Sequence, residues 1–496
     1  MTNVISQTRK APPVAMVIFG ASGDLTSRKL LPAIANLAKE GALDERFILI
    51  GVARTPLNDD SFRDLIKKAT EANQNKTLDT IIQNARYISG DYSKSETFDA
   101  LKKILDETQE LHHNNKLFYL ATVPEVFIEV ACALKANNLN TEDKDTFTRI
   151  VIEKPFGRNY ETAQQLDKSL HDCFLESQIY RIDHYMGKET VQNVLALRFA
   201  NAVFEPVWNR RYVDNIQVTV AESIGVEHRG TFYETEGALR DIVQNHVMQV
   251  LAITLMEPPP VVDAQGIRDE KVKLLKSIKI FSPDEIANKV VRGQYTAGQI
   301  DGQEVPSYRD EPGVSKDSKT ETYLAMELEV DNFRWAGVPI YVRTGKRLKR
   351  RVTDVVLTFQ KVPHLPFSPT FSRGLRQDRL VLRIQPDESI TLHFGAKVPG
   401  PEFKLQDVTM NFSYKEEFKT TPKDAYERLI LDALMGDPTL FIRTDEVQQA
   451  WKIVDPVLNG FQEDLIPLAF YQAGTWGPKE ADRLLRASQR GDWFVS

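Results

Sequence analysis

Short apolar runs alternate with longer amphipathic segments from residue 14 to about residue 183. Four of the runs are almost continuously apolar and lie at 14–19, 47–52, 116–120 and 149–152. Strands that are covered on both faces of a sheet have this composition. Segments with a helical pattern, such as 28–39 and 126–138, separate these runs. Strand and helix in alternation predict a parallel, doubly wound (Rossmann-like) α/β domain.

After about Asn215 the pattern changes to alternating apolar and polar positions, as at 216–220, 324–330, 389–394 and 408–414. This pattern predicts half-buried strands of a mainly antiparallel sheet. One long helix is expected over 236–256, ended by three prolines, and 302–320 is expected to be a loop, either a flap or an interface arm. We therefore predict two domains: a nucleotide-binding domain at 1–188, and an α+β domain at 189–496.

The length, net charge and cysteine content of the chain limit the possible functions. A chain of 496 residues is too long for a single core. The net charge of −6 argues against nucleic-acid binding as the main task. Cys132 and Cys173 are the only cysteines, which excludes a disulfide framework and indicates a reducing compartment. The first ten residues are polar, and the run at 14–19 is too short for a signal peptide or a membrane span, so we expect a cytoplasmic protein without a membrane partner.

The first predicted strand leads directly into the turn Gly20-Ala21-Ser22-Gly23-Asp24-Leu25-Thr26, and a helix is expected from near Arg28. Glycines let a backbone approach a pyrophosphate, and a helix start presents free N–H groups to it. The spacing departs from the usual dinucleotide-binding pattern, and a plain tight turn is the alternative interpretation. The position after the first strand of a doubly wound domain favours the nucleotide.

The end of the second predicted strand indicates which nucleotide binds. An acidic residue there selects the ribose hydroxyl of NAD, whereas an arginine accommodates the 2′-phosphate of NADP. The segment 51–55 offers Arg54 and has no acid before Asp59. NADP is therefore the favoured cofactor, with NAD as the alternative, and a plain surface arginine is the other interpretation of Arg54.

The densest group of reactive side chains is Arg181-Ile182-Asp183-His184-Tyr185-Met186-Gly187-Lys188-Glu189. If a helix began near His184, then His184 and Lys188 would share one of its faces. These two cations suit a phosphate, and a buried Asp183 suits the orientation of another group's proton. An ordinary ion-paired corner between strand and helix is the alternative.

Three further segments carry candidate chemistry. Lys154, in 153–157, follows a predicted strand at the sheet edge where ligands bind in open α/β folds, and a lysine that only leaves the sheet for solvent is the alternative. His246 lies in the long predicted helix, where a structural histidine is the commoner outcome unless a carboxylate such as Asp183 reaches it. Asp241, five residues earlier, does not share its face in an ideal α-helix. The segment 343–351 has six basic residues and is interpreted first as cover for an anionic small molecule, with a nucleic-acid patch or a solvated strand end as alternatives. No histidine pattern predicts a metal site.

Taken together, these segments resemble the glucose-6-phosphate dehydrogenase family. The resemblance covers nearly the whole chain and rests on five motifs in family order, at 20–25, 153–157, 181–189, 240–246 and 343–346. It implies oxidation of D-glucose 6-phosphate at C1 to 6-phospho-D-glucono-1,5-lactone, with hydride transfer to NADP, which is the first step of the oxidative pentose phosphate pathway. It also implies a homodimer or homotetramer formed through the sheet of the second domain.

The resemblance assigns roles residue by residue. His246 is implied as the general base and Asp183 as the group that orients it. The implied phosphate ligands are His184, Tyr185 and Lys188, with Arg351 near the phosphate. The implied sugar ligands are Lys154, Glu222, Asp241 and Lys346. The implied cofactor site comprises Gly20, Ala21, Ser22, Gly23, Asp24, Leu25, Arg54 and Lys154, with Asp91 and Tyr92 as further neighbours.

Two other functions fit part of the pattern. A sugar dehydrogenase of the glucose-fructose oxidoreductase type also combines a nucleotide-binding fold with a sheet and carries a Glu-Lys-Pro motif, but it does not need the phosphate ligands His184 and Lys188. A noncatalytic sensor of sugar phosphates or nucleotides would have no use for a paired base such as His246 with Asp183.

Overall fold

The computed structural model describes residues 9–70, 75–367, 375–419 and 423–495. Most of the polar N-terminal segment therefore lies outside the described residues. The chain forms two compact units. The N-terminal unit comprises Met1–Gly187, Val261–Arg268 and Lys423–Gln448, and the C-terminal unit comprises Lys188–Pro260, Asp269–Pro422 and Gln449–Ser496. Each unit is assembled from separate stretches of chain, so the two-domain boundary after residue 188 stays a prediction.

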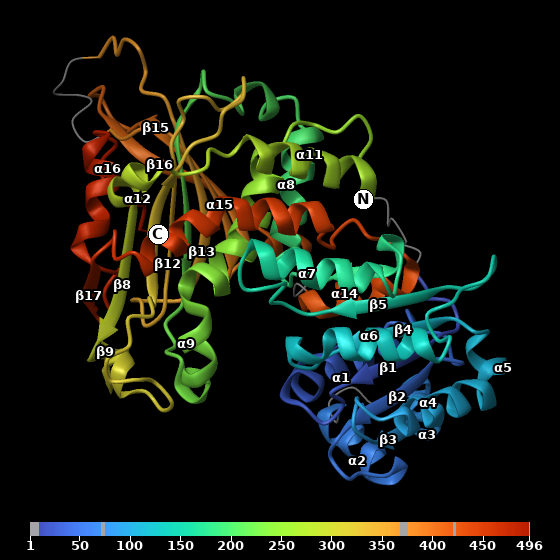
Figure 1. Ribbon diagram of the computed structural model, residues 1–496. Helices are drawn as coiled ribbons and strands as arrows, with labels where there is room; N and C mark the ends of the chain where they lie inside the picture. Colours follow the sequence, from blue (N-terminus) through green and yellow to red (C-terminus); the bar gives the residue numbers. More distant parts are fainter. Residues whose placement is uncertain (1–8, 71–74, 368–374, 420–422, 496) are drawn as a thin grey trace. The chain divides into compact units, whose positions relative to one another are not determined.

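The N-terminal unit contains a parallel six-stranded sheet with strand order β3-β2-β1-β4-β5-β6 (Figure 1). This order is that of a dinucleotide-binding fold and confirms the predicted doubly wound domain. All residues of β1, β2 and β4 are buried, as expected of strands that are covered on both faces. The strands are β1 (Ala15–Phe19), β2 (Ile48–Ala53), β3 (Arg86–Ser89), β4 (Lys116–Leu120), β5 (Thr148–Ile152) and β6 (Ile179–Arg181).

Helices connect these strands at the predicted places. The helices between strands are η1 (Thr26–Leu30), α1 (Leu31–Lys39), α2 (Asp59–Thr70), α3 (Lys76–Asn84), α4 (Ser95–Glu107), α5 (Gln109–His112), η3 (Pro124–Val126), α6 (Phe127–Ala136), α7 (Tyr160–His171) and η4 (Glu176–Gln178). A distant stretch adds α14 (Ala425–Met435), whose first turn is capped by Asp424. An isolated antiparallel bridge also pairs Arg181, the last residue of β6, with Ile442, which lies shortly after α14 in the chain.

The C-terminal unit is built on a nine-stranded mixed sheet with strand order β16-β15-β14-β13-β7-β12-β11-β8-β17. Its neighbours are antiparallel except for β7 with β12 and β8 with β17, so the prediction of a large, mainly antiparallel sheet is confirmed. The strands are β7 (Val213–Ala221), β8 (Val290–Thr296), β11 (Tyr323–Leu328), β12 (Ile340–Gly345), β13 (Val352–Phe359), β14 (Arg379–Gln385), β15 (Ser389–Lys397), β16 (Leu405–Ser413) and β17 (Leu468–Gln472).

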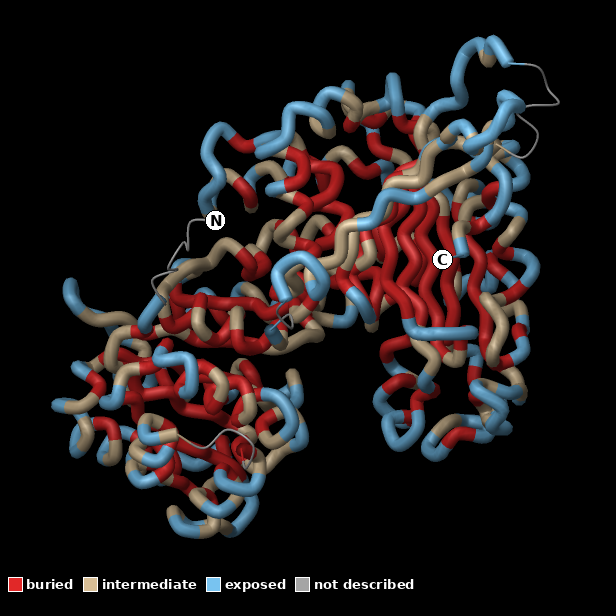
Figure 2. The backbone as a smooth tube through the Cα atoms, turned by 180° about the vertical axis from the view of Figure 1, so that it is seen from behind, coloured by how far each residue is buried: buried red, intermediate tan, exposed pale blue. Residues whose placement is uncertain are grey.

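The expectation of half-buried strands is wrong for the centre of this sheet. Nearly every residue of β7, β12 and β13 is buried, including polar ones such as Gln217 and Thr219 (Figure 2). These polar side chains have hydrogen-bond partners inside the unit. Thr219 Oγ1 accepts from Arg343 Nε at 3.0 Å, and Gln217 Oε1 accepts from the backbone N–H of Phe494 at 2.7 Å. The outer strands β15 and β16, and β17 at the opposite edge, keep intermediate or exposed positions along most of their length.

The remaining elements of the C-terminal region cover the sheet or connect its strands. They are α8 (Glu189–Phe199), η5 (Glu205–Val207), η6 (Glu227–Arg229), α9 (Gly230–Ala238), η7 (Leu239–Val247), α10 (Met248–Leu255), α11 (Ala264–Ser277), α12 (Pro283–Lys289), α13 (Tyr414–Phe418), α15 (Thr444–Gln462), η9 (Lys479–Ala481) and α16 (Asp482–Ala487). Among the described residues, no helix has both the length and the apolar character that a membrane span requires.

The segment 302–320 is not the free loop that its composition predicted. Its start forms a hairpin, β9 (Gly298–Ile300) with β10 (Gln303–Val305), and a short helix η8 (Tyr308–Asp310) follows. Tyr308 is fully buried, and both its hydroxyl, at 2.5 Å, and that of Ser318, at 2.7 Å, donate to the Glu234 carboxylate on α9. These contacts anchor the second half of the segment within the C-terminal unit, so it is not a free flap.

Candidate active site

The backbone of the turn after β1 comes very close to the chain that follows β4. Gly20 has φ +85°, and a Cβ built there would lie 2.4 Å from the carbonyl oxygen of Ala121, the residue that follows β4. Only glycine fits this position. The gap between β1 and β4 is the topological switch point of the sheet, where doubly wound folds bind nucleotides. The backbone N–H of Gly20 donates to the Tyr92 hydroxyl at 3.0 Å, which brings one of the suggested cofactor neighbours to this turn.

The helix after this turn begins earlier than predicted. Thr26 Oγ1 donates to the carbonyl of Gly20 at 3.0 Å, and the π-helical turn η1 starts at Thr26 rather than near Arg28. Asp24 is exposed and Leu25 is partly exposed, whereas Ala21 is fully buried beneath the turn. The segment Gly20–Leu25 therefore presents a helix start at the carboxyl edge of the sheet, which suits a pyrophosphate.

Arg54 lies at the same edge, directly after β2 and exposed. The neighbouring Thr55 hydroxyl is 2.8 Å from the Ser22 hydroxyl, so the end of β2 and the glycine turn are joined. Hydrogen bonds from Ser93, and then the positive charge of Arg54, lower the pKa of the exposed Asp91 carboxyl. Glycine turn, Arg54, Asp91 and Tyr92 thus belong to one sheet edge, and the donor set fits a dinucleotide with a phosphorylated ribose.

Lys154 and Glu153 follow β5 at this edge, as predicted. The Tyr119 hydroxyl donates to Glu153 Oε1 at 2.6 Å, and Tyr426 of α14 is a second hydrogen-bond partner of this carboxyl. Burial raises the pKa of Glu153 to about 7, against the opposing effects of Tyr119 and of the Lys154 charge. Neither Tyr119 nor Tyr426 was singled out from the sequence, because no local pattern distinguishes them from other buried tyrosines.

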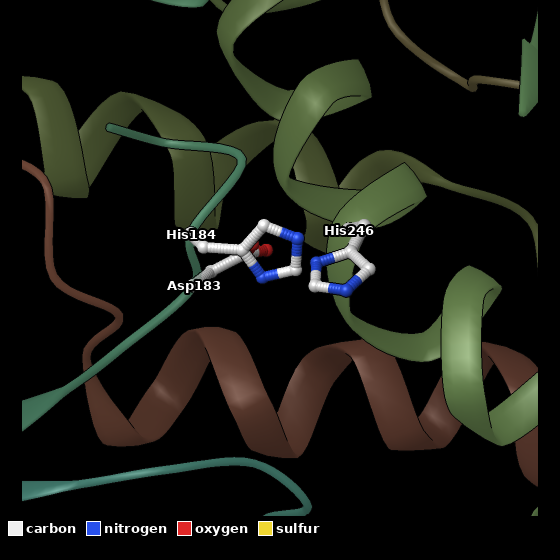
Figure 3. Close-up of side chains that lie close together, drawn as sticks. All are labelled: Asp183, His184 and His246. Carbon is white, nitrogen blue, oxygen red and sulfur yellow. The ribbon is translucent and has the colours of Figure 1, made fainter. Parts of the chain in front are cut away.

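Asp183 and His184 lie on the segment after β6 (Figure 3). Asp183 is buried, and its Oδ1 accepts from the backbone N–H of Tyr185 at 2.8 Å. The ring of His184 lies 5.0 Å from that of Tyr185 and is nearly parallel to that of Tyr426 at 6.5 Å. The Asp183 charge contributes to the raised pKa values of Glu153 and Tyr426, so these groups share one neighbourhood of the N-terminal unit.

The predicted common helical face of His184 and Lys188 is wrong. Residues 184–187 form a turn, closed by the N–H of Met186 on the carbonyl of Asp183 at 3.0 Å, and α8 begins only at Glu189. Lys188 is the residue before that helix. The turn is fixed by Gly187, where a Cβ would lie 2.7 Å from the carbonyl oxygen of Ala425 at the start of α14. The close contact at Gly187 therefore lies inside the turn that precedes α8.

In the C-terminal unit the structure brings together three of the predicted sugar ligands. Lys346 is buried, with its Nζ 2.6 Å from Glu222 Oε2 and 3.7 Å from Asp241 Oδ2. Glu222 follows β7 and Lys346 follows β12, and these two strands are parallel neighbours, so both residues leave the sheet at one edge. Asp241 comes from the helical segment η7. A lysine between two carboxylates is a polar group suited to sugar hydroxyls.

His246 lies on the same helical segment as Asp241 (Figure 3). This segment is a π-helix with bonds from residue i to i+5, so the spacing of five between Asp241 and His246 corresponds to one turn. The prediction of a continuous helix from Glu236 is corrected: α9 begins at Gly230 and is broken at Gly237, which has φ +65°. The Glu321 carboxylate fills the space where a Cβ would lie and accepts the N–H of Leu239, which begins the new helix.

The basic segment 343–351 is divided among several contacts. Arg343 is buried and lies over the rings of Trp476 and Trp493, whereas Lys346 belongs to the cluster with Glu222 and Asp241. Arg351 is exposed, and its guanidinium donates to Gln385 Oε1 at 3.0 Å. The interpretation of this segment as one continuous cover for an anion is therefore too simple.

One group has metal-ligand spacing that the sequence analysis did not find. The potential ligand atoms of Asp167, His171 and Glu176 lie within 4.8 Å of one another. The Arg181 guanidinium donates to Asp167 at 2.7 Å and to Glu176 at 2.9 Å. This buried arginine supplies the positive charge that the carboxylates need, so the group is an ion-pair network and we assign no metal to it.

Two protein-family models together match almost the whole chain. The family model "Glucose-6-phosphate dehydrogenase, NAD binding domain" matches residues 17–193, and "Glucose-6-phosphate dehydrogenase, C-terminal domain" matches residues 195–494. The chain belongs to the glucose-6-phosphate dehydrogenase family. Membership confirms the expected NADP-dependent dehydrogenase class and the combination of a Rossmann-like domain with a domain built on a large sheet.

Individual relatives of the family match nearly the whole chain. A glucose-6-phosphate 1-dehydrogenase of Aggregatibacter actinomycetemcomitans is 47% identical, over 97% of both chains. That of Bacillus subtilis (strain 168) is 42% identical, over 97% of this chain and 98% of its own. Among solved structures, a glucose-6-phosphate dehydrogenase in complex with its substrate glucose-6-phosphate is similar with a TM-score of 0.89 and 35% identity, covering 99% of this chain and 100% of its own.

Proposed function

We propose that His246 and Asp183 form the catalytic pair with which this dehydrogenase oxidises D-glucose 6-phosphate at C1. The product is 6-phospho-D-glucono-1,5-lactone, and the reaction is the first step of the oxidative pentose phosphate pathway. The observation that carries the proposal is the π-helical turn, which presents His246 one turn after Asp241. Since Asp241 belongs to the Lys346 cluster, a sugar held by that cluster is near the helix that bears the base.

In the proposed mechanism His246 removes the proton of the C1 hydroxyl as general base. The acceptor for the hydride from C1 would be supplied by bound NADP. Asp183 orients the His246 imidazole, fixes its tautomer and stabilises its positive charge after proton uptake. The backbone N–H of Tyr185, which donates to Asp183, holds this carboxylate in one rotamer.

The remaining site residues bind and orient the reactants. His184, Tyr185 and Lys188 are proposed to bind the phosphate, with Arg351 close to it, and Lys154, Glu222, Asp241 and Lys346 are proposed to bind the sugar hydroxyls. Binding energy at the phosphate, remote from C1, serves to orient the reacting hydrogen. Gly20, Ala21, Ser22, Gly23, Asp24, Leu25, Arg54 and Lys154 are proposed to hold the dinucleotide.

The nine-stranded sheet of the C-terminal unit provides a surface for oligomerisation. On β15 and β16 the directly paired residues Ile390 and Phe412, Leu392 and Met410, and Phe394 and Val408 share one face. All are partly exposed or exposed, and Met410 retains 62% of its surface. An apolar face of this kind is stable in water when a second copy covers it, so we propose a homodimer, alone or within a homotetramer. We place the enzyme in the cytoplasm and assign it no nucleic-acid partner.

Substrate selection tests the assignment. The absorbance of reduced nicotinamide is followed with glucose 6-phosphate and with unphosphorylated glucose, each in the presence of NADP and then of NAD. We expect glucose 6-phosphate with NADP to be used far more efficiently than glucose, because glucose lacks the phosphate that His184 and Lys188 are proposed to bind. Comparable efficiencies for the two sugars would favour a dehydrogenase of the glucose-fructose oxidoreductase type. Binding of both ligands without turnover would favour a sensor.

A further inference from the structure

The only two cysteines of the chain are in contact although 41 positions separate them. Cys132 lies on α6 and Cys173 follows α7, with a distance of 3.2 Å between the two Sγ atoms. Neither is in a disulfide. A disulfide bond is about 2.0 Å long, so the sulfurs need to approach by about 1.2 Å to form one. Side-chain rotations achieve a change of this size.

Hydrogen bonds from surrounding residues hold the two backbone segments in place. Lys135, one turn after Cys132 on α6, donates to the carbonyl of Asp172 at 2.5 Å. Asn140 donates to the carbonyl of Cys173 at 2.5 Å, and its own carbonyl accepts from Gln178 at 3.1 Å. The proximity of the thiols is therefore set by the fold of the N-terminal unit and does not depend on one side-chain rotamer.

The two thiols differ in access to solvent. Cys132 is exposed, whereas Cys173 is buried with 5% of its surface accessible. Burial raises the pKa of the Cys173 thiol to about 12. Since oxidants react with the thiolate at an accessible sulfur, the reagent meets Cys132 first, and Cys173 is in position to resolve the product.

We propose that Cys132 and Cys173 are a reversible dithiol–disulfide pair that a hydroperoxide oxidises. The Cys132 sulfur attacks the peroxide, the O–O bond breaks, and Cys132 becomes a sulfenic acid while the second oxygen leaves as water or alcohol with the thiol proton. The Cys173 sulfur then attacks the Cys132 sulfur, the S–O bond breaks, and the hydroxyl leaves as water with the second thiol proton. Formation of one disulfide therefore reduces one hydroperoxide by two electrons. A dithiol reductant converts the disulfide back to the two thiols.

The position of the pair predicts its effect. Cys173 lies before β6 begins, whereas Gly20, Lys154 and Asp183 all lie beyond the carboxyl ends of their strands. The disulfide would tie α6 to the connection between α7 and β6 without touching the cofactor-binding edge. Closing a loop of this length restricts the unfolded chain, so oxidation is expected to stabilise the N-terminal unit and to leave the hydride-transfer activity in place.

The test uses the full chain treated with hydrogen peroxide and then freed of it. We expect loss of both titratable thiols under denaturing conditions, an intact mass lower by two hydrogen atoms, and one peptide pair joining Cys132 to Cys173. The first thermal unfolding transition should rise by several degrees, with turnover unchanged within twofold. Dithiothreitol should reverse all four changes: the loss of thiols, the lower mass, the joined peptides and the higher unfolding transition. Persistence of both thiols, or disulfides found only between chains, would overturn the proposal.

Two matched variants keep the test decisive. In Cys173→Ser the exposed Cys132 has no resolving partner, so peroxide should add oxygen to it and leave the unfolding transition where it was. In Cys132→Ser the buried Cys173 should remain a thiol under the same treatment. Equal oxidation of the two single variants would contradict the proposed order of events. A rise of the unfolding transition in either variant would show that the stabilisation does not come from the disulfide.

Discussion

Glu153 shows how one residue is tuned by its surroundings at the edge of the parallel sheet. It follows β5 beside Lys154, accepts from Tyr119 at 2.6 Å and also interacts with Tyr426. Burial outweighs these favourable contacts, so the pKa is raised to about 7 and the carboxyl changes its charge near neutral pH. A carboxyl next to the proposed sugar ligand Lys154 therefore alters the local charge within the working range of the enzyme.

This raised pKa predicts the pH dependence of stability. Between about pH 4.5 and pH 7 the folded chain holds the Glu153 proton while the unfolded chain has lost it, so stability falls as the pH rises through this window. Glu153→Gln keeps the acceptor for Tyr119 and removes the titration. We expect the variant to gain about 2 kcal/mol relative to the wild type between pH 5 and pH 8, measured by urea unfolding of the full chain.

The control is Glu129→Gln, which changes an exposed carboxylate on α6 of the same unit. Its unfolding free energy should follow the wild type at each pH. If the difference between Glu153→Gln and the wild type does not change with pH, the proton is not held more tightly in the folded chain.

Replacement of the proposed base separates chemistry from binding. In His246→Asn the side chain keeps a polar end but takes up no proton, so turnover should fall by about 10²-fold or more while substrate affinity changes little. Steady-state kinetics with glucose 6-phosphate and NADP measure both quantities. His228→Asn, an exposed histidine of the same unit, should behave like the wild type. A His246→Asn enzyme with nearly normal turnover would show that another group is the base.

At the scale of elements, hydrophobic patterning predicted the strands better than the helices. The buried runs that became β1, β2, β4 and β5 were recognisable because a strand covered on both faces has few alternatives. The interior of the predicted long helix was not recognisable. Its break at Gly237 depends on Glu321, far along the chain, which fills the space beside the glycine and accepts the N–H of Leu239. No local pattern encodes a contact over such a sequence separation.

The contrast between local patterns and contacts over long sequence separations also explains which parts of the site were predictable. The glycine turn and Arg54 could be placed from the sequence because both directly follow buried strands. The relation of Asp241 to His246 could not, because five residues span one turn only in the π-helical geometry that the structure shows. The turn at 184–187 was likewise mistaken for a helix start, since its conformation is set by the close contact of Gly187 with Ala425.

At the scale of the whole molecule, the period-two pattern of the late strands indicates assembly. In the central strands β7 and β11 nearly all residues on both faces are buried, so alternation there did not mean exposure of one face. In β15 and β16 the alternation separates an apolar face, which includes Leu392 and Met410, from a polar face, which includes His393 and Thr409. This pair of strands offers an apolar face that a second copy of the sheet can cover.

A charge placed on that face should dissociate the assembly. Met410→Asp adds a carboxylate that a symmetric interface would bury twice, once from each chain. We expect the wild type to sediment as a dimer or larger assembly, and Met410→Asp to sediment as a monomer at the same concentration, with the dissociation constant raised by about 10²-fold or more. Thr409→Asp introduces the same charge one residue away, on the polar face, and should leave the assembly intact because its carboxylate stays in water. Dissociation by both variants would mean that charge alone, and not its position on the apolar face, controls assembly, whereas dissociation by neither would place the contact between copies on another surface.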